Sequence, residues 1–138
     1  MALTVVFDTN ILFSATGWRG NPFQCVEQAR AGNIEAVTCV ELMEELTEKL
    51  ELKLGFSSEQ SAETLADLLS FLRVVSISKT LNAVSRDPDD DAVLECALEG
   101  NVRFVVSGDN DLLELQKFRG IKIVRAGKFL EILQKQRG

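Results

Sequence analysis

Short apolar runs rich in β-branched and aromatic residues alternate along this chain with longer segments of helical spacing. The runs predict five strands, at residues 3–7, 34–40, 74–77, 103–107 and 121–124. The longer segments predict helices that begin at residue 11, cover 23–31, 41–54, 57–72 and 89–98, follow residue 111, and cover 128–134. Strands joined by helices pair in parallel through right-handed crossovers. We therefore predict an α/β fold, a three-layer α/β/α sandwich with a central, mostly parallel five-stranded sheet.

The length and composition of the chain suit one folded unit. With 138 residues, of which 46% are hydrophobic, the chain can bury one sizeable core, and we expect residues 1–138 to form a single domain. Its apolar start lacks basic residues and is interrupted at Asp8, well short of a signal or membrane segment. We therefore expect a cytoplasmic protein with no membrane contact.

Several kinds of catalysis are excluded by the residue types that the chain lacks. There is no histidine, which excludes serine–histidine and cysteine–histidine catalysis and zinc sites built on imidazole. The three cysteines, Cys25, Cys39 and Cys96, are widely spaced among apolar neighbours, which favours buried thiols. No glycine-rich phosphate loop with Gly-Lys-Ser/Thr occurs. Because tyrosine is also absent, carboxylates are the main remaining chemistry.

Two aspartates directly follow predicted strands. Asp8 comes after the first strand and Asp109 comes shortly after the fourth. The carboxyl ends of parallel strands share one edge of a sheet, and ligands bind there at the point where the strand order reverses. We therefore expect both carboxylates at that edge, although each could also serve only as the N-cap of the next helix.

A third aspartate is placed by helical spacing. Asp90 shares the i, i+4, i+7 face of the predicted helix 89–98 with Leu94 and Ala97, so it should point inward. Asp89 and Asp91 lie about 100° to either side, where we interpret them as solvated acids of the first helical turn. Carboxylates crowded together repel or take up protons unless a cation shares the site. Oxygen ligands without nitrogen or sulfur favour Mg²⁺ or Mn²⁺.

The predicted helix 41–54 has leucines at 42, 46, 50 and 54 on one face. The apolar hairpin from Leu42 to Leu72, of which this helix is the first part, could supply a homodimer interface, or its leucines could face the core of the protein. The helix also carries four glutamates, and the spacing does not select one of them as functional: Glu41, Glu44, Glu45 and Glu48.

The charge distribution is uneven. The net charge is −6, which argues against a nucleic-acid partner, but residues 117–138 hold seven basic residues and one acid. Lys117, Arg119 and Lys122 are therefore candidate RNA contacts. The alternative is that these side chains are solvated and that the last ones complement a helix C-terminus.

Taken together, these segments resemble the PIN-domain family. The resemblance spans nearly the whole chain and is closest to the branch described as toxins of toxin–antitoxin pairs, the VapC-like ribonucleases. The segments that carry it are Asp8 to Asn10, Val40 to Leu46, Arg86 to Asp91 with Leu94 and Ala97, and Val106 to Leu112.

The resemblance implies a Mg²⁺- or Mn²⁺-dependent endoribonuclease that hydrolyses single-stranded RNA, with an antitoxin protein as partner and with homodimers common in the family. The resemblance is compatible with one or two metal ions and with a further metal contact from Asp91 or Asp111. The implied acidic quartet, which would also hold the metal, is Asp8, Glu45, Asp90 and Asp109, and the implied supporting residues are Asn10, Ser107 and Asp111.

Two other functions compete with this one. A phosphatase of the haloacid-dehalogenase type also has an aspartate after its first strand, but it needs a second acid two residues later, and this chain has Asn10 there. The other alternative is a non-catalytic PIN scaffold that only binds RNA or protein, which metal-dependent nuclease assays would distinguish.

Overall fold

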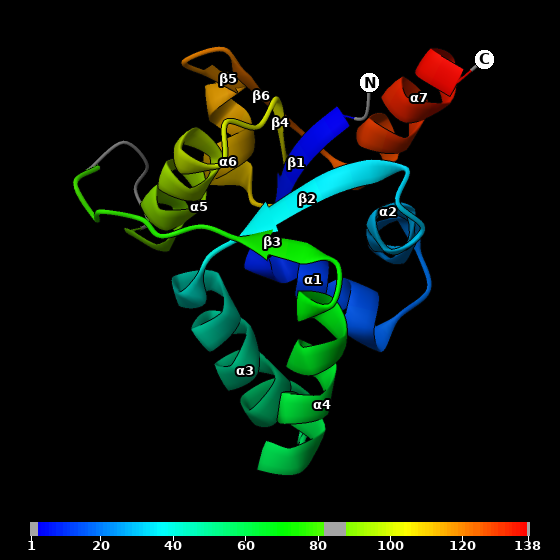
Figure 1. Cartoon of the computed structure of the whole chain (residues 1–138), viewed down its shortest axis with the longest axis vertical. Helices are drawn as coiled ribbons and strands as arrows, with labels where there is room; N and C mark the ends of the chain where they lie inside the picture. The colour runs from blue at the N-terminus through cyan, green and yellow to red at the C-terminus, as the bar shows by residue number, and fades with distance from the viewer. Residues whose placement is uncertain (1–2, 82–87, 138) are drawn as a thin grey trace.

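The computed structural model, which describes residues 3–81 and 88–137, has a central sheet with helices on both faces (Figure 1). The strands are β1 (Leu3–Phe7), β2 (Ile34–Thr38), β3 (Leu72–Val74), β4 (Phe104–Val106), β5 (Lys117–Phe118) and β6 (Ile121–Val124). The helices are α1 (Thr9–Gly17), α2 (Asn21–Arg30), α3 (Val40–Leu54), α4 (Ser58–Leu69), α5 (Pro88–Glu99), α6 (Asn110–Leu115) and α7 (Ala126–Arg137). The predicted α/β class and layering are confirmed. The part of the predicted third motif at residues 86–87 lies outside the described residues, as does the side chain of Asp89.

The sheet has the order β3-β2-β1-β4-β6-β5. All neighbouring strands are parallel except β5 and β6, which form an antiparallel hairpin. The predicted number of five strands was therefore wrong by one: β5 has only two residues, too few for apolar alternation to reveal it. Its pairing depends on the turn at Arg119 and Gly120, both of which have positive φ.

The strand order reverses between β1 and β4. From β1 the chain continues outward to β2 and β3, whereas β4 is followed on its other side by β6. The two central strands pair in register from Val5 with Phe104 to Phe7 with Val106, and the Asp8 N–H donates to the Val106 carbonyl at 3.1 Å. The carboxyl ends of β1 and β4 therefore form the switch point at which α/β sheets bind ligands.

The third strand lies earlier in the chain than predicted. It covers residues 72–74, not 74–77, because α4 ends at Leu69 and the chain enters the sheet directly. The start of α4 follows the expected chemistry: Ser57 and Gln60 form a reciprocal capping box after Gly55, which ends α3 in the left-handed conformation. Together α3 and α4 form a helical hairpin below the sheet (Figure 1).

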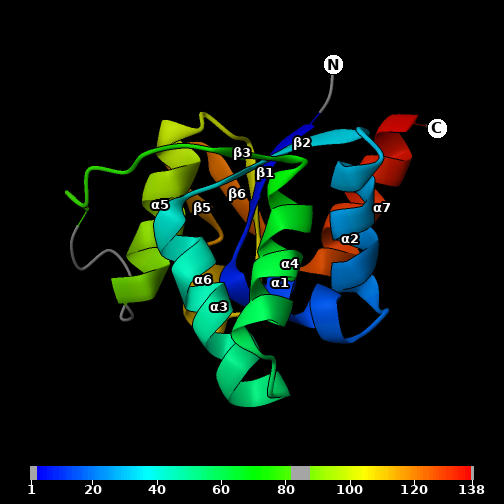
Figure 2. The ribbon, with the colours of Figure 1, turned by 60° about the horizontal axis from the view of Figure 1, so that its bottom comes forward.

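Alternate residues of the central strands face two separate cores. Leu3, Val5 and Phe7 of β1 belong to the core under α1, α2 and α7, whereas Val6 faces the core under α5 and α6. Figure 2 shows α2 and α7 on one side of the sheet and α5 and α6 on the other. The three cysteines are buried free thiols, as predicted.

The α3 leucines face the protein's own core. Leu42, Leu46 and Leu50 are fully buried within this one chain, so of the two predicted alternatives the core is the correct one for them. In the part of the chain that the structure describes, no helix is both long enough and apolar enough to cross a membrane.

The end of α5 offers a test of core packing. A Cβ at Gly100 would lie 2.7 Å from Cγ1 of Val37 and 3.2 Å from the carbonyl oxygen of Cys96, whereas a Cβ at Gly108 meets nothing within 4 Å. Because Val37 is buried and branched, it cannot yield, and we expect Gly100→Ala to destabilise the protein by about 1–3 kcal/mol. Gly108→Ala is the matched control and should change stability by less than about 0.5 kcal/mol. Urea unfolding of both variants checks this, and equal stability would show that β2 and α5 are less closely packed than described.

Candidate metal centre

Asp8 lies at the end of β1 and is the N-cap of α1. Its Oδ1 accepts the Ile11 N–H at 2.9 Å, and its Oδ2 accepts a short hydrogen bond from the Ser107 hydroxyl. The Ser107 Oγ in turn accepts the Asp109 N–H at 2.9 Å. This chain of hydrogen bonds joins the ends of β1 and β4 across the switch point, and it fixes the orientation of the buried Asp8 carboxylate.

Asp109 caps α6 in the same way. Its Oδ1 accepts the Asp111 N–H at 2.7 Å and the Leu112 N–H at 3.4 Å. Capping and clustering were alternative interpretations of Asp8 and Asp109 in the sequence, and the structure shows both at once. Each carboxylate caps its helix with one oxygen, which leaves the other oxygen for different contacts.

Asp90 lies in the first turn of α5 and is only 6% exposed. Leu94 and Ala97 on the same face are fully buried, so the predicted inward direction of this face is confirmed. The prediction that Asp91 is solvated was wrong, because this residue is 7% exposed.

Asp91 shares a second face of α5 with Glu95, one turn further on. Glu95 is buried and accepts the Lys79 N–H at 2.5 Å and the Leu81 N–H at 2.8 Å. The segment 79–81 therefore lies against this face of α5 at Glu95, a contact that no local pattern in the sequence reveals.

Glu45 and Lys49 lie one turn apart on α3, beside the start of α1. The Lys49 Nζ is 3.3 Å from the Glu45 Oε1 and donates to the Asn10 Oδ1 at 2.5 Å. Glu44 and Glu48 are exposed, and Glu41 pairs with Lys79 at 3.4 Å. Of the four glutamates that periodicity could not separate, Glu45 is the one that lines the cavity described next.

A polar cavity of about 50 Å³ lies at the switch point. It contains the four residues of the predicted quartet, with Asn10 beside them. Asp111 belongs to the same acidic cluster: carboxylate oxygens of Asp90, Asp109 and Asp111 lie within 4.8 Å of one another. The cavity is lined by Asp8, Thr9, Asn10, Glu45, Lys49, Asp90, Val93 and Asp109.

Burial dominates the electrostatics of Asp8 and raises the pKa of its carboxyl from 3.8 to about 6. The hydrogen bonds from Ser107 and from the Ile11 N–H lower this pKa, as does the charge of Lys49, while the charge of Asp109 raises it. The net effect is a carboxylate whose negative charge is costly in this structure. A cation in the cavity would remove that cost.

The residues present suit a hard divalent cation. All acidic donors are carboxylate oxygens, the ligand type that Mg²⁺ and Mn²⁺ prefer. Thr9 also lines the cavity, and its buried Oγ1 has no hydrogen-bond partner among the described residues. Buried polar atoms are normally satisfied, so this hydroxyl has a further partner to gain when the site is filled.

The three predicted RNA contacts lie elsewhere. Lys117 and Lys122 pair in the β5–β6 hairpin, and Arg119 is in its turn. Because β6 is parallel to β4, this turn lies at the amino ends of the parallel strands, opposite the acidic cavity. Arg119 lines a separate cavity of about 700 Å³ there, with Thr4 and Arg103.

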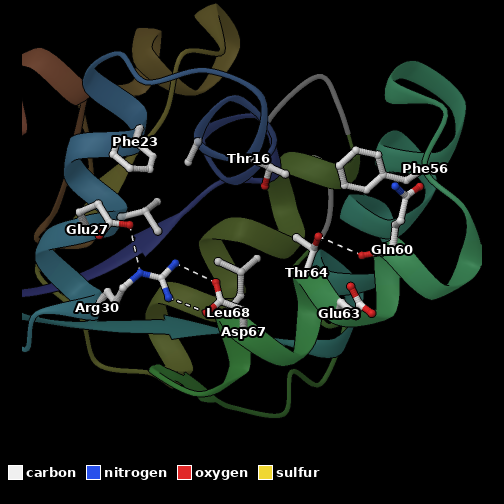
Figure 3. A pocket seen from close by; sticks show the side chains of 12 residues that line it. Thr16, Phe23, Glu27, Arg30, Phe56, Gln60, Glu63, Thr64, Asp67 and Leu68 are labelled. Carbon is white, nitrogen blue, oxygen red and sulfur yellow. Dashed lines mark hydrogen bonds and ion pairs between the residues drawn. The ribbon is translucent and has the colours of Figure 1, made fainter.

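A third cavity, of about 440 Å³, lies between α1, α2 and α4 (Figure 3). Arg30 crosses one side of it, with Nη1 and Nη2 at 2.6 and 2.8 Å from the two carboxylate oxygens of Asp67 and Nε at 3.0 Å from Glu27. This network ties α2 to α4. The cavity shares no lining residue with the acidic one.

Sequence reasoning missed Thr9 and Lys49. Glu45 and Lys49 form an i, i+4 pair, a spacing that the sequence displays and that would have drawn attention to Lys49. No comparable signal marks Thr9, because its role depends on the burial of the α1 start.

Residues 4–111 match the family model described as PIN domain. The chain belongs to the PIN-domain family. PIN domains are generally nucleases and typically use divalent metal ions. The matched range includes every acidic residue of the cavity, which places the cluster within the part of the chain that defines the family.

Two solved structures share the fold. A chain in the crystal structure of VapBC2 from Rickettsia felis, bound to a DNA fragment from their promoter, matches with a TM-score of 0.62 and 16% identity, over 88% of this chain and 97% of that chain. PAE2754 from Pyrobaculum aerophilum matches with a TM-score of 0.62 and 17% identity, over 99% of this chain and 92% of that chain. No curated protein sequence matches the chain.

The raised pKa of Asp8 predicts how the stability of the metal-free PIN domain depends on pH. Well above pH 6 the carboxyl is charged in both the folded and the unfolded chain, so the cost of burying it is fully present. As the pH falls through about 6 toward 3.8, the folded chain takes up the proton first and the cost disappears. A pKa raised from 3.8 to about 6 corresponds to a cost on the order of 3 kcal/mol.

Asp8→Asn, which keeps the cap and removes the charge, should therefore stabilise the metal-free protein at pH 8, with a difference that shrinks toward pH 4. Urea unfolding in EDTA at several pH values measures this difference. Glu114→Gln, a neutralisation of an exposed acid on α6, is the control and should give a small difference at every pH. If the difference in unfolding free energy between Asp8→Asn and wild type does not change with pH, the pKa of the Asp8 carboxyl is not raised in the folded protein.

Proposed function

We propose that this PIN domain is a metal-dependent endoribonuclease that hydrolyses phosphodiester bonds of single-stranded RNA. The observation that carries the proposal is the convergence of Asp8, Glu45, Asp90 and Asp109 on one small polar cavity at the switch point. The fold alone would not support it, since many functions share α/β architectures. Family membership supports it as well, because PIN domains are generally nucleases.

The four acids of the cavity would hold Mg²⁺ or Mn²⁺, with Asn10, Ser107 and Asp111 in supporting positions. A bound ion of this kind supplies charge for a phosphate oxygen and lowers the pKa of water at the site. Asp109 and Asp90 approach each other from the starts of two different helices, so the cluster needs the folded sheet edge to exist.

The chain's own residues preorganise this site. Ser107 and the Ile11 N–H hold the Asp8 carboxylate from two sides, so that it does not need to reorient on binding. Lys49 holds the Asn10 amide and lies beside the Glu45 carboxylate. Its side chain is 23% exposed, so its ammonium group is also available to a phosphate that enters the cavity.

The phosphatase alternative is not supported by the site. Its second acid would stand at position 10, where the Asn10 amide oxygen accepts a hydrogen bond from Lys49 and offers no carboxylic proton. The match to the PIN-domain model also covers the segment on which that alternative depended. The non-catalytic scaffold is excluded by any metal-dependent cleavage in the assays below.

We further propose that this protein is the toxin of a toxin–antitoxin pair. The shared fold with a chain of VapBC2 supports this role. A small antitoxin-like reading frame beside the gene, whose product co-purifies with this chain, would test it. The predicted homodimer is a separate expectation, and sedimentation of the purified protein measures it.

Asp8→Asn tests the proposed quartet. The change removes the charge of a proposed metal ligand without changing its volume, so the folded variant should lose RNA cleavage. Cleavage of a labelled single-stranded RNA is measured at saturating Mg²⁺, with circular dichroism to confirm folding. Wild-type rates from a folded Asp8→Asn protein would eliminate Asp8 as a ligand and the quartet with it.

Glu45→Gln tests the least constrained member of the quartet against its neighbours on α3. We expect it to weaken Mn²⁺ binding and to reduce the cleavage rate, with partial rescue by excess Mn²⁺ because mass action refills a weakened site. Glu44→Gln and Glu48→Gln are matched controls on exposed positions and should change stability by less than about 0.5 kcal/mol and leave the rate near normal. An inactive Glu44→Gln together with an active Glu45→Gln would show that α3 is turned differently from the structure described here.

A further inference from the structure

The surface beside the acidic cavity continues along the adjoining helices α1 and α3, which pack against each other. We call this surface the α1–α3 strip and define it as Asn10, Phe13 and Trp18 from the α1 side and Lys49 and Lys53 from α3. Asn10 and Lys49 line the acidic cavity and are hydrogen-bonded to each other at 2.5 Å. The strip therefore begins inside the proposed active site.

One helical turn further out, the next pair of strip residues also meets. Phe13 follows Asn10 by three positions and Lys53 follows Lys49 by four, so each lies directly beyond its predecessor. The Lys53 Nζ lies 5.8 Å from the centre of the Phe13 ring, and the Trp18 and Phe13 rings are 6.0 Å apart. From residue 10 to residue 18, the strip extends about 12 Å at 1.5 Å per helical residue.

The cations of the strip face α1 together with Glu45, which pairs with Lys49, whereas the acids nearest the outer end of the strip do not. At about 100° per residue, Glu48 and Glu51 are turned by roughly 100° or more from Lys49 and Lys53. Lys53 has no carboxylate within ion-pair distance among the described residues, and the same holds for Arg19, which follows Trp18 and lies 4.7 Å above the Phe23 ring. The outer end of the strip is therefore positively charged although the protein is acidic.

Trp18 is the only tryptophan of the chain, and it is 58% exposed. A single exposed apolar residue is ordinary on a protein surface. Trp18 is different because its ring lies beside that of Phe13, which Lys53 also approaches, and because Arg19 follows it in the chain. Neither cation has an ion-pair partner among the described residues. Exposed aromatic rings combined with unpaired cations are what proteins use to hold single-stranded nucleic acid, by stacking bases and neutralising phosphates.

We infer that the α1–α3 strip is the path along which the RNA strand leaves the acidic cavity. Lys49 and Lys53 contact phosphates and Trp18 stacks a base. The inference rests on the proposed nuclease function, since it names the surface that holds the substrate of that same site. It also places RNA contacts beside the cavity, whereas Lys117, Arg119 and Lys122 lie at the opposite end of the strands.

A protein partner would fit this surface less well. A helix or a second copy that docks on it would have to place a carboxylate opposite each of Lys53 and Arg19, because burying unpaired charges is costly. A phosphate backbone supplies the missing negative charges at intervals along the strand. Because Asn10 and Lys49 belong to both the strip and the acidic cavity, a strand held in the cavity for cleavage would extend onto the strip.

The experiment uses the Asp8→Asn protein and a short single-stranded RNA that gel electrophoresis shows to stay intact during the measurement. Because the chain has one tryptophan, its emission reports on Trp18 alone. We expect RNA to quench this emission with the same Kd that anisotropy of the labelled RNA gives. Double-stranded RNA, whose bases cannot stack on the ring, should quench it much less.

Variants in the same background separate the stacking contribution from the charge contribution. Trp18→Ala should raise the Kd by roughly fivefold to 150-fold, the range that stacking of one base provides, while Trp18→Phe should retain most of the affinity. Lys53→Gln should weaken binding and reduce the slope of log Kd against log salt by about 0.7, the value for one phosphate contact on a single strand. Leu52→Ala, at an exposed apolar position of α3, and Lys128→Gln, on α7, are matched controls and should bind like the parent.

The outcomes distinguish this inference from the function on which it rests. If wild-type protein cleaves RNA but Trp18→Ala and Lys53→Gln bind RNA with unchanged affinity, the role of the α1–α3 strip is overturned and the proposed nuclease function is retained. If RNA quenches the Trp18 emission and both variants lose affinity while wild-type protein cleaves no RNA, the strip is supported as an RNA-binding surface and the proposed nuclease function is overturned. Absence of RNA binding overturns the strip, and so does a change of oligomeric state in Trp18→Ala, which would assign the surface to a second protein chain.

Discussion

The parallel pairing of β1 with β4 is the contact on which the rest of the structure depends. The chain leaves these two strands in opposite directions along the sheet, so their carboxyl ends stand side by side with no third strand end between them. The residues that follow, Asp8 on one strand and Ser107 and Asp109 on the other, are connected by hydrogen bonds that exist only in this register. A shift by one residue would reverse the facing of the apolar side chains and separate the carboxylates.

The acidic cavity combines two opposing demands. Helix starts favour carboxylates, because the free N–H groups of the first turn need acceptors, and the cavity is surrounded by three helix starts. Gathering those carboxylates in a buried place is unfavourable, as the raised pKa of Asp8 shows. Lys49 offsets part of this cost from α3. The balance leaves a site with more negative charge than the protein itself neutralises.

Local patterns in the sequence were sufficient for β1, β2, β4 and β6, for the apolar face of α5 and hence for the burial of Asp90. They were insufficient wherever the burial or position of a side chain depends on a segment far away in the sequence. Periodicity placed Asp91 in solvent, whereas the residue is buried on the face of α5 that carries Glu95. Periodicity left Glu45 undetermined, because the packing of α3 on α1 selects it. The β5–β6 hairpin places Arg119 at the end of the sheet opposite the cavity. Because β5 has only two residues, no apolar alternation reveals it in the sequence. Sequence therefore predicted which elements meet at the switch point, but not the contacts between segments far apart in the chain.

The buried charge of Asp8 has a consequence for the lifetime of the protein. Any cation that binds the folded chain and not the unfolded one shifts the folding equilibrium by mass action. Here the cation would remove the cost of burying the Asp8 carboxylate, which would raise its affinity for the folded chain and with it the size of this shift. Proteases that attack transiently unfolded chains would then remove the metal-free form faster than the loaded one. The concentration of divalent cations would set how long each molecule survives, in addition to how fast it reacts.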